Sequence, residues 1–211
     1  MTIPAPSMVE LRLPLFPFEG MSVEQQAAYE AILAGPRGRL IGPLRAALHN
    51  PELASRWSRL GELLRYDLIL PARLKELAII MVGRRWSSQI EWWVHSASAR
   101  DAGLDEAVID AIHRAQSPIF AREDEREIYE YGRTLQECGS VPADLHRRIT
   151  DRWGARGAVE LTALIGYYTM VCMTLNAHDI PLPDGCTPPF DGAAAGLVSL
   201  APSGRVNGSA E

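Results

Sequence analysis

The chain has 211 residues, of which 47% are hydrophobic and 22% charged, and its formal net charge at pH 7 is −5. This length suits one domain with a full hydrophobic core and does not require two domains. The ordinary composition and the negative charge argue against nucleic-acid binding, which usually shows as a basic patch or a basic domain. Three widely spaced cysteines without a C-x-x-C pair are typical of the reducing cytoplasm rather than of a disulfide framework.

Composition divides the chain into a helical middle and two irregular ends. Residues 1–21 start with a proline-rich stretch that lacks the basic and apolar regions of a signal peptide, so we expect an extended N-terminal arm. Residues 184–211 turn to Pro, Gly, Ala and Ser, which predicts a flexible C-terminal tail. Between these ends we expect a single-domain helical bundle over residues 22–183.

Helix start and stop signals punctuate this middle region. Ser22 is a good N-cap for the first helix, and Asn50 followed by Pro51 opens another. Gly103 suits the left-handed residue that ends a helix, and Asp105 caps the next one. The expected helical segments cover 23–34, 44–49, 51–65, 106–115, 122–138, 142–153 and 155–177. Two more are expected between residues 71 and 102, separated by a turn at 87–88. Almost no stretch alternates as a strand does, so the predicted fold class is all-α.

Two helical stretches are apolar on nearly every face. Leu77–Val82 has no polar residue, which predicts a helix buried on most sides. Ala158–Leu175 is long enough to raise the question of a membrane span, but it contains Glu160 and three threonines, so we expect a buried helix and no membrane partner. The two stretches offer more hydrophobic surface than a small monomer readily hides, which favours a homo-oligomer.

Glu76 is a carboxylate on the mostly apolar face of a helix. Its neighbours three and four residues away are Ala72, Arg73, Ile79 and Ile80. A carboxylate in that setting must be paired, hydrogen-bonded or protonated, and such a group suits general acid–base chemistry. The alternative interpretation is a structural ion pair with Arg73 or another arginine.

Glu91 and His95 are spaced i, i+4, which places a carboxylate and an imidazole on one face of a helix. A carboxylate beside a histidine fixes the tautomer of the ring, so the pair can shuttle a proton near neutral pH. The alternative is an ordinary surface pair worth a few tenths of a kcal/mol. The adjacent Trp92 and Trp93 suggest either a walled pocket or a core or subunit interface.

Metal and nucleotide chemistry find little support in the sequence. Glu91 and His95 supply two potential ligands and another histidine could add a third, but no H-E-x-x-H or comparable spacing occurs. The sequence also has no G-x-G-x-x-G, no P-loop and no G-x-S-x-G. We therefore expect neither a metal nor an organic cofactor.

Several segments in a fixed order resemble the carboxymuconolactone decarboxylase and alkylhydroperoxidase D superfamily. They are Arg73–Gly83 followed by Glu91–His95, with flanking matches at His49–Ala54, at Ala102–Leu104 and at Glu160–Asn176. The resemblance covers about residues 40–183. It implies an alkylhydroperoxidase D-like helical bundle that assembles as trimers or hexamers.

The same resemblance distinguishes two kinds of chemistry. In the peroxidase branch a redox C-x-x-C precedes the histidine, and aligning that histidine with His95 places the two cysteines at Ser88 and Glu91. Neither position is a cysteine, so the usual thiol peroxidase chemistry lacks its thiolate. Glu76 falls at the position of the proton-relay glutamate of that branch. The resemblance therefore implies a cofactor-independent decarboxylase-type lyase with Glu76, Glu91 and His95 as catalytic residues.

A small lactone or carboxylic acid is the expected substrate, and a dianionic one also needs a cation. Arg73, Arg84 and Arg85 are the nearest in sequence, and we take Arg73, Arg85 and Trp92 as candidate substrate-binding residues. Two alternatives stay open. One is redox chemistry at Cys138 or Cys172, although a thiol inside an apolar helix is usually inert. The other is a non-catalytic helical assembly protein, in which the Glu91–His95 pair would face solvent or another subunit with no cavity beside it.

Overall fold

The computed structural model describes residues 12–36, 38, 40, 42–190 and 196–204. In this part of the chain the secondary structure is entirely helical, with eight α-helices after one short 3-10 turn and no strand. The elements are η1 (Phe18–Gly20), α1 (Val23–Ala34), α2 (Pro43–Ala47), α3 (Pro51–Tyr66), α4 (Ala72–Arg85), α5 (Gln89–Asp101), α6 (Glu106–His113), α7 (Glu123–Cys138) and α8 (Ala143–Ala177). The prediction of a single all-α domain is confirmed.

Local capping chemistry explains where several helices begin and end. The Ser22 hydroxyl accepts from the Gln25 backbone and the Gln25 side chain accepts from the Ser22 backbone, which forms a capping box at α1. The Asn50 side chain accepts from the backbone of the first turn of α3, and Pro51 occupies its first position. After α5, Gly103 adopts φ 84°, the left-handed conformation that glycine takes without strain.

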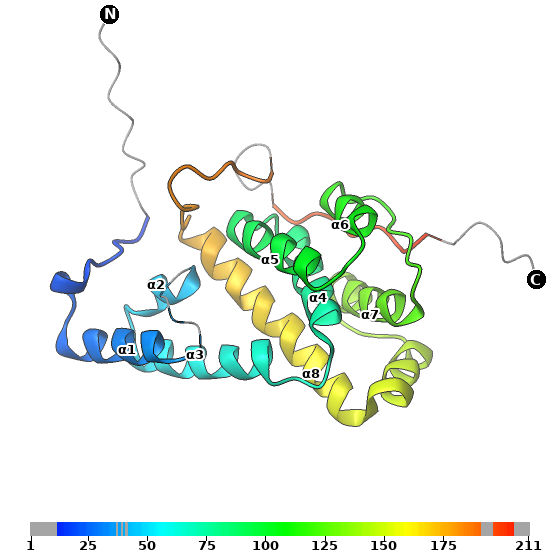
Figure 1. Ribbon diagram of the computed structural model, residues 1–211, viewed down its shortest axis with the longest axis horizontal. Helices are drawn as coiled ribbons and strands as arrows, with labels where there is room; N and C mark the ends of the chain where they lie inside the picture. Colours follow the sequence, from blue (N-terminus) through cyan, green and yellow to red (C-terminus); the bar gives the residue numbers. More distant parts are fainter. Residues whose placement is uncertain (1–11, 37, 39, 41, 191–195, 205–211) are drawn as a thin grey trace, which may run out of the picture.

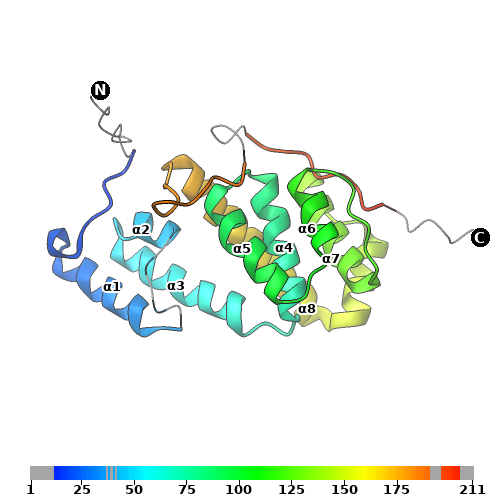
Figure 2. The same ribbon diagram turned by 45° about the horizontal axis from the view of Figure 1, so that its top comes forward.

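Helix α4 is the centre of the bundle and packs against α5, α7 and α8 (Figure 1, Figure 2). All residues of its apolar stretch Leu77–Val82 are at most 1% exposed, as the all-round apolar pattern predicts. Helices α1 and α3 lie side by side on one flank, and α2 packs between α3 and α8. A tight turn at Trp86–Ser88 returns the chain from α4 into α5, so these two helices form a hairpin.

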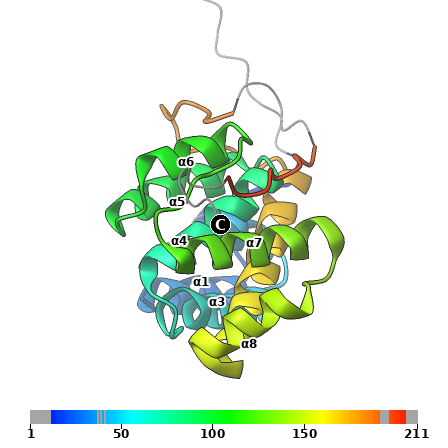
Figure 3. The same cartoon turned by 90° about the vertical axis from the view of Figure 1, so that its right-hand side faces the viewer.

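Helix α8 contains a sharp break at Gly154, which has φ 69° and ψ 176° (Figure 3). The two helical segments expected at 142–153 and 155–177 therefore follow one another directly, and α8 is interrupted between them at Gly154. By length and composition α8 could cross a membrane, but half of its most apolar window is buried inside the protein. The core helix of a soluble protein has the same composition, and burial against α4 and α7 is the role that the structure gives this helix.

The C-terminal segment differs from the flexible tail expected over 184–211. Residues 196–204 run along α7 and the end of α4, where the Val198 backbone N–H donates to the Arg85 carbonyl. The Tyr129 hydroxyl donates to the Ala201 carbonyl at 2.8 Å, and Leu200 is only 4% exposed. Buried polar and apolar contacts therefore fix this segment, despite its small and polar composition. The expectations for 1–11, 191–195 and 205–211 lie outside the described residues.

The backbone of Gly154 predicts a sharp difference between two glycines of α8. A Cβ at φ 69° and ψ 176° is strongly disfavoured, whereas Gly166 lies in regular helix with nothing near its added Cβ. We expect Gly154→Ala to lower the free energy of unfolding by about 1–3 kcal/mol. Gly166→Ala should raise it by about 0.5–1 kcal/mol. Chemical denaturation of both variants checks this, and equal effects would contradict the assigned break.

Candidate active site

The three predicted acid–base residues meet at the interface between α4 and α5. His95 Nδ1 lies 2.7 Å from Glu76 Oε2, and His95 Nε2 lies 3.4 Å from Glu91 Oε2. Glu76 comes from α4, whereas Glu91 and His95 come from successive turns of α5. The imidazole therefore has one carboxylate at each ring nitrogen. An ionised carboxylate only accepts hydrogen bonds, so Nδ1 donates to Glu76 and Nε2 is left for proton exchange on the Glu91 side.

This centre is buried. His95 is 2% exposed and Glu91 5%, and the side chain of Glu76 is 13% exposed. Close packing of the two helices positions the groups, because Gly83 of α4 lies against the backbone of Glu91 and Trp92. A charge-assisted hydrogen bond between helices is stronger in such surroundings than in water. The geometry suits a group that holds a proton in a fixed direction.

Tyrosine side chains from α8 close the centre on another side. The Tyr168 ring packs edge-on against the His95 ring, with 5.1 Å between centroids. Burial, and then the negative charge of Glu91, raises the pKa of the Tyr168 hydroxyl well above its usual value. Tyr168 therefore stays protonated over the working range of a protein and can only donate or accept a hydrogen bond as a neutral phenol.

A cavity of about 30 Å³ lies beside the imidazole. Glu91, His95 and Tyr168 line it together with Arg65, which projects from the last turn of α3. A space of this size holds about one water molecule or the end of a small polar group. We call it the inner cavity.

A larger cavity of about 490 Å³ adjoins the inner one, and we call it the outer chamber. The two share Gly42, Ile90 and Val94 as lining residues. The rest of the outer chamber is mainly apolar, with Trp93 on one wall and Arg45 as its cationic residue. A volume of several hundred Å³ with few polar groups is typical of a small-molecule site.

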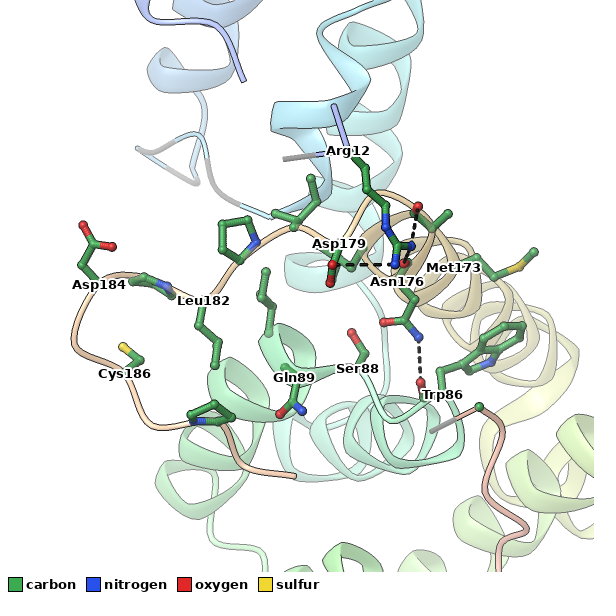
Figure 4. A pocket seen from close by; sticks show the side chains of 18 of the residues that line it. Arg12, Trp86, Ser88, Gln89, Met173, Asn176, Asp179, Leu182, Asp184 and Cys186 are labelled. Carbon is green, nitrogen blue, oxygen red and sulfur yellow. Dashed lines mark hydrogen bonds and ion pairs between the residues drawn. The ribbon is translucent and has the colours of Figure 1, made fainter. Parts of the chain in front are cut away.

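A third cavity, about 850 Å³, lies at the start of α5 and is not lined by Glu76, Glu91 or His95. Figure 4 shows Ser88 and Gln89 on its floor and Arg12 with Asp179 at one side. The Gln89 side chain exchanges two 3.0 Å hydrogen bonds with the Phe190 backbone and so fastens the covering loop. This cavity shares Ile90 with the inner cavity, and residues 180–184 also line the outer chamber.

The arginines predicted to bind substrate, Arg73 and Arg85, form ion pairs with α7 and line none of the three cavities described above. Arg73 forms ion pairs with Asp124, at 2.9 Å, and with Glu125, both on α7. Arg85 pairs with Glu137 at 3.1 Å and also donates to the chain carbonyl that anchors the C-terminal segment. Both guanidinium groups tie α4 to α7 rather than line a cavity. The alternative pairing of Arg73 with Glu76 is likewise not found.

Trp92 and Arg84 are structural as well. Trp92 is 5% exposed and packs against the rings of His113 and Phe190, with centroids 5.1 and 5.5 Å away. It lines none of the three cavities described above. The Arg84 guanidinium lies over the Phe190 ring at 4.7 Å, and burial lowers its pKa. Of the two adjacent tryptophans, Trp93 is the one that lines a cavity, the outer chamber.

Arg65, Arg45 and Tyr168 could not be predicted from the sequence, because their positions at the inner cavity and the outer chamber depend on long-range packing. Arg65 and Arg45 come from α3 and α2, and Tyr168 comes from α8. The only available signal was the paired tyrosines within the segment that resembles the closing helix of the superfamily. Among the described residues, no group of three His, Cys, Asp or Glu side chains is arranged to hold a metal ion.

The cysteines bear on the redox alternative. All three are free, and Cys172 of α8 is fully buried, whereas Cys138 is exposed. Burial first, and the Glu91 charge second, raise the pKa of the Cys172 thiol well above its usual value, although a hydrogen bond with Ser88 lowers it. A neutral, enclosed thiol is a poor nucleophile.

Several solved structures have similar folds, and two of them are described below. A peroxidase-related protein from Silicibacter sp. TM1040 matches with a TM-score of 0.65 and 16% identity, over 86% of this chain and 96% of its own. The debrominase Bmp8, in complex with 2,3,4-tribromopyrrole, matches with a TM-score of 0.63 and 17% identity, over 84% and 94%. The sequence matches no family profile and no curated protein at a significant level. The chain therefore has the alkylhydroperoxidase-like fold, in which enzymes occur.

Differences in thiol burial predict a clear order of alkylation. Iodoacetamide at pH 8 should modify Cys138 rapidly in the native protein, because its thiol is exposed. Cys172 should react only after unfolding in guanidinium, because its raised pKa keeps the thiol neutral at that pH. Peptide mass spectrometry with a time course measures both rates, and the Cys138→Ser variant provides the control. Rapid native labelling of Cys172 would instead restore the redox alternative.

Proposed function

We propose that this protein is a cofactor-independent lyase that uses Glu76, His95 and Glu91 as an acid–base centre on a small lactone or carboxylic acid. The single observation that carries the proposal is the buried imidazole with one carboxylate at each ring nitrogen. His95 and Glu91 both line the inner cavity, where a small polar group fits. The fold of the similar structures includes enzymes that handle small molecules, which supports the class but not the reaction.

Decarboxylation is the reaction that this centre suits best. In an unsaturated lactone acid, the bond from carbon to the departing carboxylate breaks and its electron pair moves into the ring carbonyl, which gives a dienolate and carbon dioxide. The protonated Nε2 of His95 then delivers its proton to carbon, and the enolate electrons form the new C–H bond. One proton is consumed for each carbon dioxide released. The substrate is its own electron sink, so the protein supplies position, charge stabilisation and a proton.

The two glutamates have different roles in this proposal. Glu76 accepts the hydrogen bond from Nδ1, so it orients the ring and stabilises its protonated form. Glu91 lies near Nε2 on the side of the inner cavity and returns a proton to the ring after each turnover. Tyr168 restricts the ring to this direction by packing against its edge.

Both alternatives are less well supported. A thiol peroxidase needs an accessible thiolate, and the thiol nearest to this centre is enclosed and kept neutral. A non-catalytic assembly protein predicts a Glu91–His95 pair in solvent or at an interface, with no cavity beside it. The pair is instead buried and borders a cavity.

The proposed reaction is tested with γ-carboxymuconolactone. We expect metal-free protein to release carbon dioxide, and His95→Ala, Glu76→Gln and Glu91→Gln each to lower kcat by about a hundredfold or more, the size typical of general acid–base catalysis. His146→Ala is the control, because this exposed histidine lies in the first part of α8. Absence of release from the wild type removes this substrate. Full activity in the three site variants removes the assigned centre.

We also propose that the protein is a cytoplasmic homo-oligomer, a trimer or a hexamer. The exposed side of α8 carries Val159, Met170 and Met173, which are 69%, 37% and 50% exposed. The exposed side of α3 adds Leu60 and Leu63 at 45% and 50%. Apolar surface gathered on two helices is typical of a subunit interface.

Charge on the α8 face should weaken such an assembly. We expect Met170→Lys combined with Met173→Lys to shift the mass measured by light scattering toward the monomer, because two buried lysines would have no partner in the interface. Arg147→Ala, at an exposed position outside this face, should leave the mass unchanged. A wild-type protein that is monomeric at high concentration would contradict the proposal.

A further inference from the structure

The arginines in the described part of the chain differ in whether they form an ion pair with a carboxylate. Most arginines form ion pairs with carboxylates, on the surface and between helices alike. Arg45 and Arg65 are half-buried, and neither has a carboxylate within ion-pair distance among the described residues. Half-buried guanidinium groups are usually paired, because lost hydration must be replaced by other hydrogen bonds.

These two arginines are also the ones that line the cavities at the acid–base centre. Arg65 borders the inner cavity together with Glu91, His95 and Tyr168. Arg45 borders the outer chamber, which adjoins the inner cavity at shared lining residues. The two cations come from α2 and α3, which pack against each other. Arg65 thus lines the cavity that His95 also lines, and Arg45 lines the cavity that shares residues with it.

We propose that Arg45 and Arg65 form an anion-binding site that takes a small organic acid, with its carboxylate on Arg45 and its reacting end beside Arg65. A guanidinium matches a carboxylate with two parallel hydrogen bonds, which gives direction as well as strength. The apolar wall of the outer chamber, including Trp93 and Leu182, suits the carbon skeleton. This assignment names the substrate class of the proposed lyase and takes its catalytic meaning from that function.

Arg65 places a guanidinium at the inner cavity, which His95 and Glu91 also line. An oxygen that gains negative charge next to His95 would be stabilised by this cation. At the outer chamber the corresponding acidic residue is Asp184, which is exposed and so is screened by solvent.

Size divides the ligand between the two spaces. The inner cavity of about 30 Å³ admits only a carbonyl or carboxyl end, whereas the outer chamber of about 490 Å³ takes a ring or a short chain. A compact acid with one planar ring meets both limits. Benzoate is therefore a suitable unreactive probe, and benzamide is its neutral counterpart of the same shape.

Binding of these two probes tests the site without any turnover. We expect titration calorimetry, together with quenching of tryptophan fluorescence through Trp93, to show saturable benzoate binding and about tenfold or weaker benzamide binding. Arg45→Gln should weaken benzoate binding by about tenfold or more, and Arg45→Lys should retain part of it. Arg65→Gln should weaken binding of benzene-1,4-dicarboxylate by about tenfold or more, because the second carboxylate of this probe reaches the inner cavity. Arg59→Gln is the matched control, because Arg59 is an exposed arginine of α3 outside both cavities.

Equal affinity for benzoate and benzamide, no benzoate binding, wild-type benzoate binding by Arg45→Gln, or wild-type dicarboxylate binding by Arg65→Gln would overturn the anion site. Circular dichroism identifies a variant that has lost its fold, and the lysine variant then decides. Failure of the proposed reaction is a separate result. Arginine-dependent benzoate binding without carbon dioxide release from the lactone leaves the anion site in place and removes the decarboxylase.

Discussion

The hydrogen bond between His95 and Glu76 is the interaction on which this site depends. It joins α4 to α5 across the core, at 2.7 Å, where neither side chain can rely on water. Breaking such a pair by removal of one partner leaves an uncompensated buried charge or donor, which costs far more than an exposed pair would. This hydrogen bond therefore helps to hold α4 against α5, and the packing of the two helices in turn fixes the direction of the imidazole.

The hydrogen bond between His95 and Glu76 lies in apolar surroundings because α4 is mostly apolar. Helices α5, α7 and α8 enclose α4, so the single carboxylate that faces α5 lies at the edge of a dry core. Arginines of α4 that leave the core, Arg73 and Arg85, are used to attach α7 and the C-terminal segment. The charges of α4 thus divide into two sets: Glu76 serves the α5 side, and the arginines hold the opposite side of the bundle. A dry surrounding strengthens the electrostatic effect of each group on the imidazole.

Local sequence signals predicted the helices and the proximity of Glu91 to His95, and long-range packing explains what they did not predict. The capping residues Ser22 and Asn50 set helix starts, because capping is a contact within one turn. The i, i+4 spacing likewise placed Glu91 beside His95. The partner of an arginine, in contrast, depends on which helix lies opposite. Proximity in sequence therefore suggested Arg73, whereas the cavity beside His95 contains Arg65 from another helix.

Small and polar residues also predicted flexibility for the C-terminal segment, where residues 200–203 instead form hydrogen bonds with α7. Main-chain hydrogen bonds to Glu130, Glu137 and Tyr129 hold it, and these do not depend on the side chains of the segment itself. The backbone N–H and C=O groups of any segment can form hydrogen bonds with neighbouring helices, whatever its side chains are. Amino-acid composition therefore predicts flexibility only for segments that have no such hydrogen-bond partners.

The resemblance to the thiol peroxidases allows Glu91 to be compared with the cysteine at the same position in those proteins. In that comparison Glu91 takes the position of the cysteine nearest to the histidine, so a carboxylate replaces a thiolate next to the same imidazole. Both are anions that can share a proton with His95, but the carboxylate cannot form a disulfide or reduce a peroxide. The thiol that remains nearby, Cys172, is held neutral by the burial and by the charge of Glu91 itself. In the proposed enzyme, Ser88 and Glu91 at the two cysteine positions remove the redox pair, and Glu91 can still exchange a proton with His95.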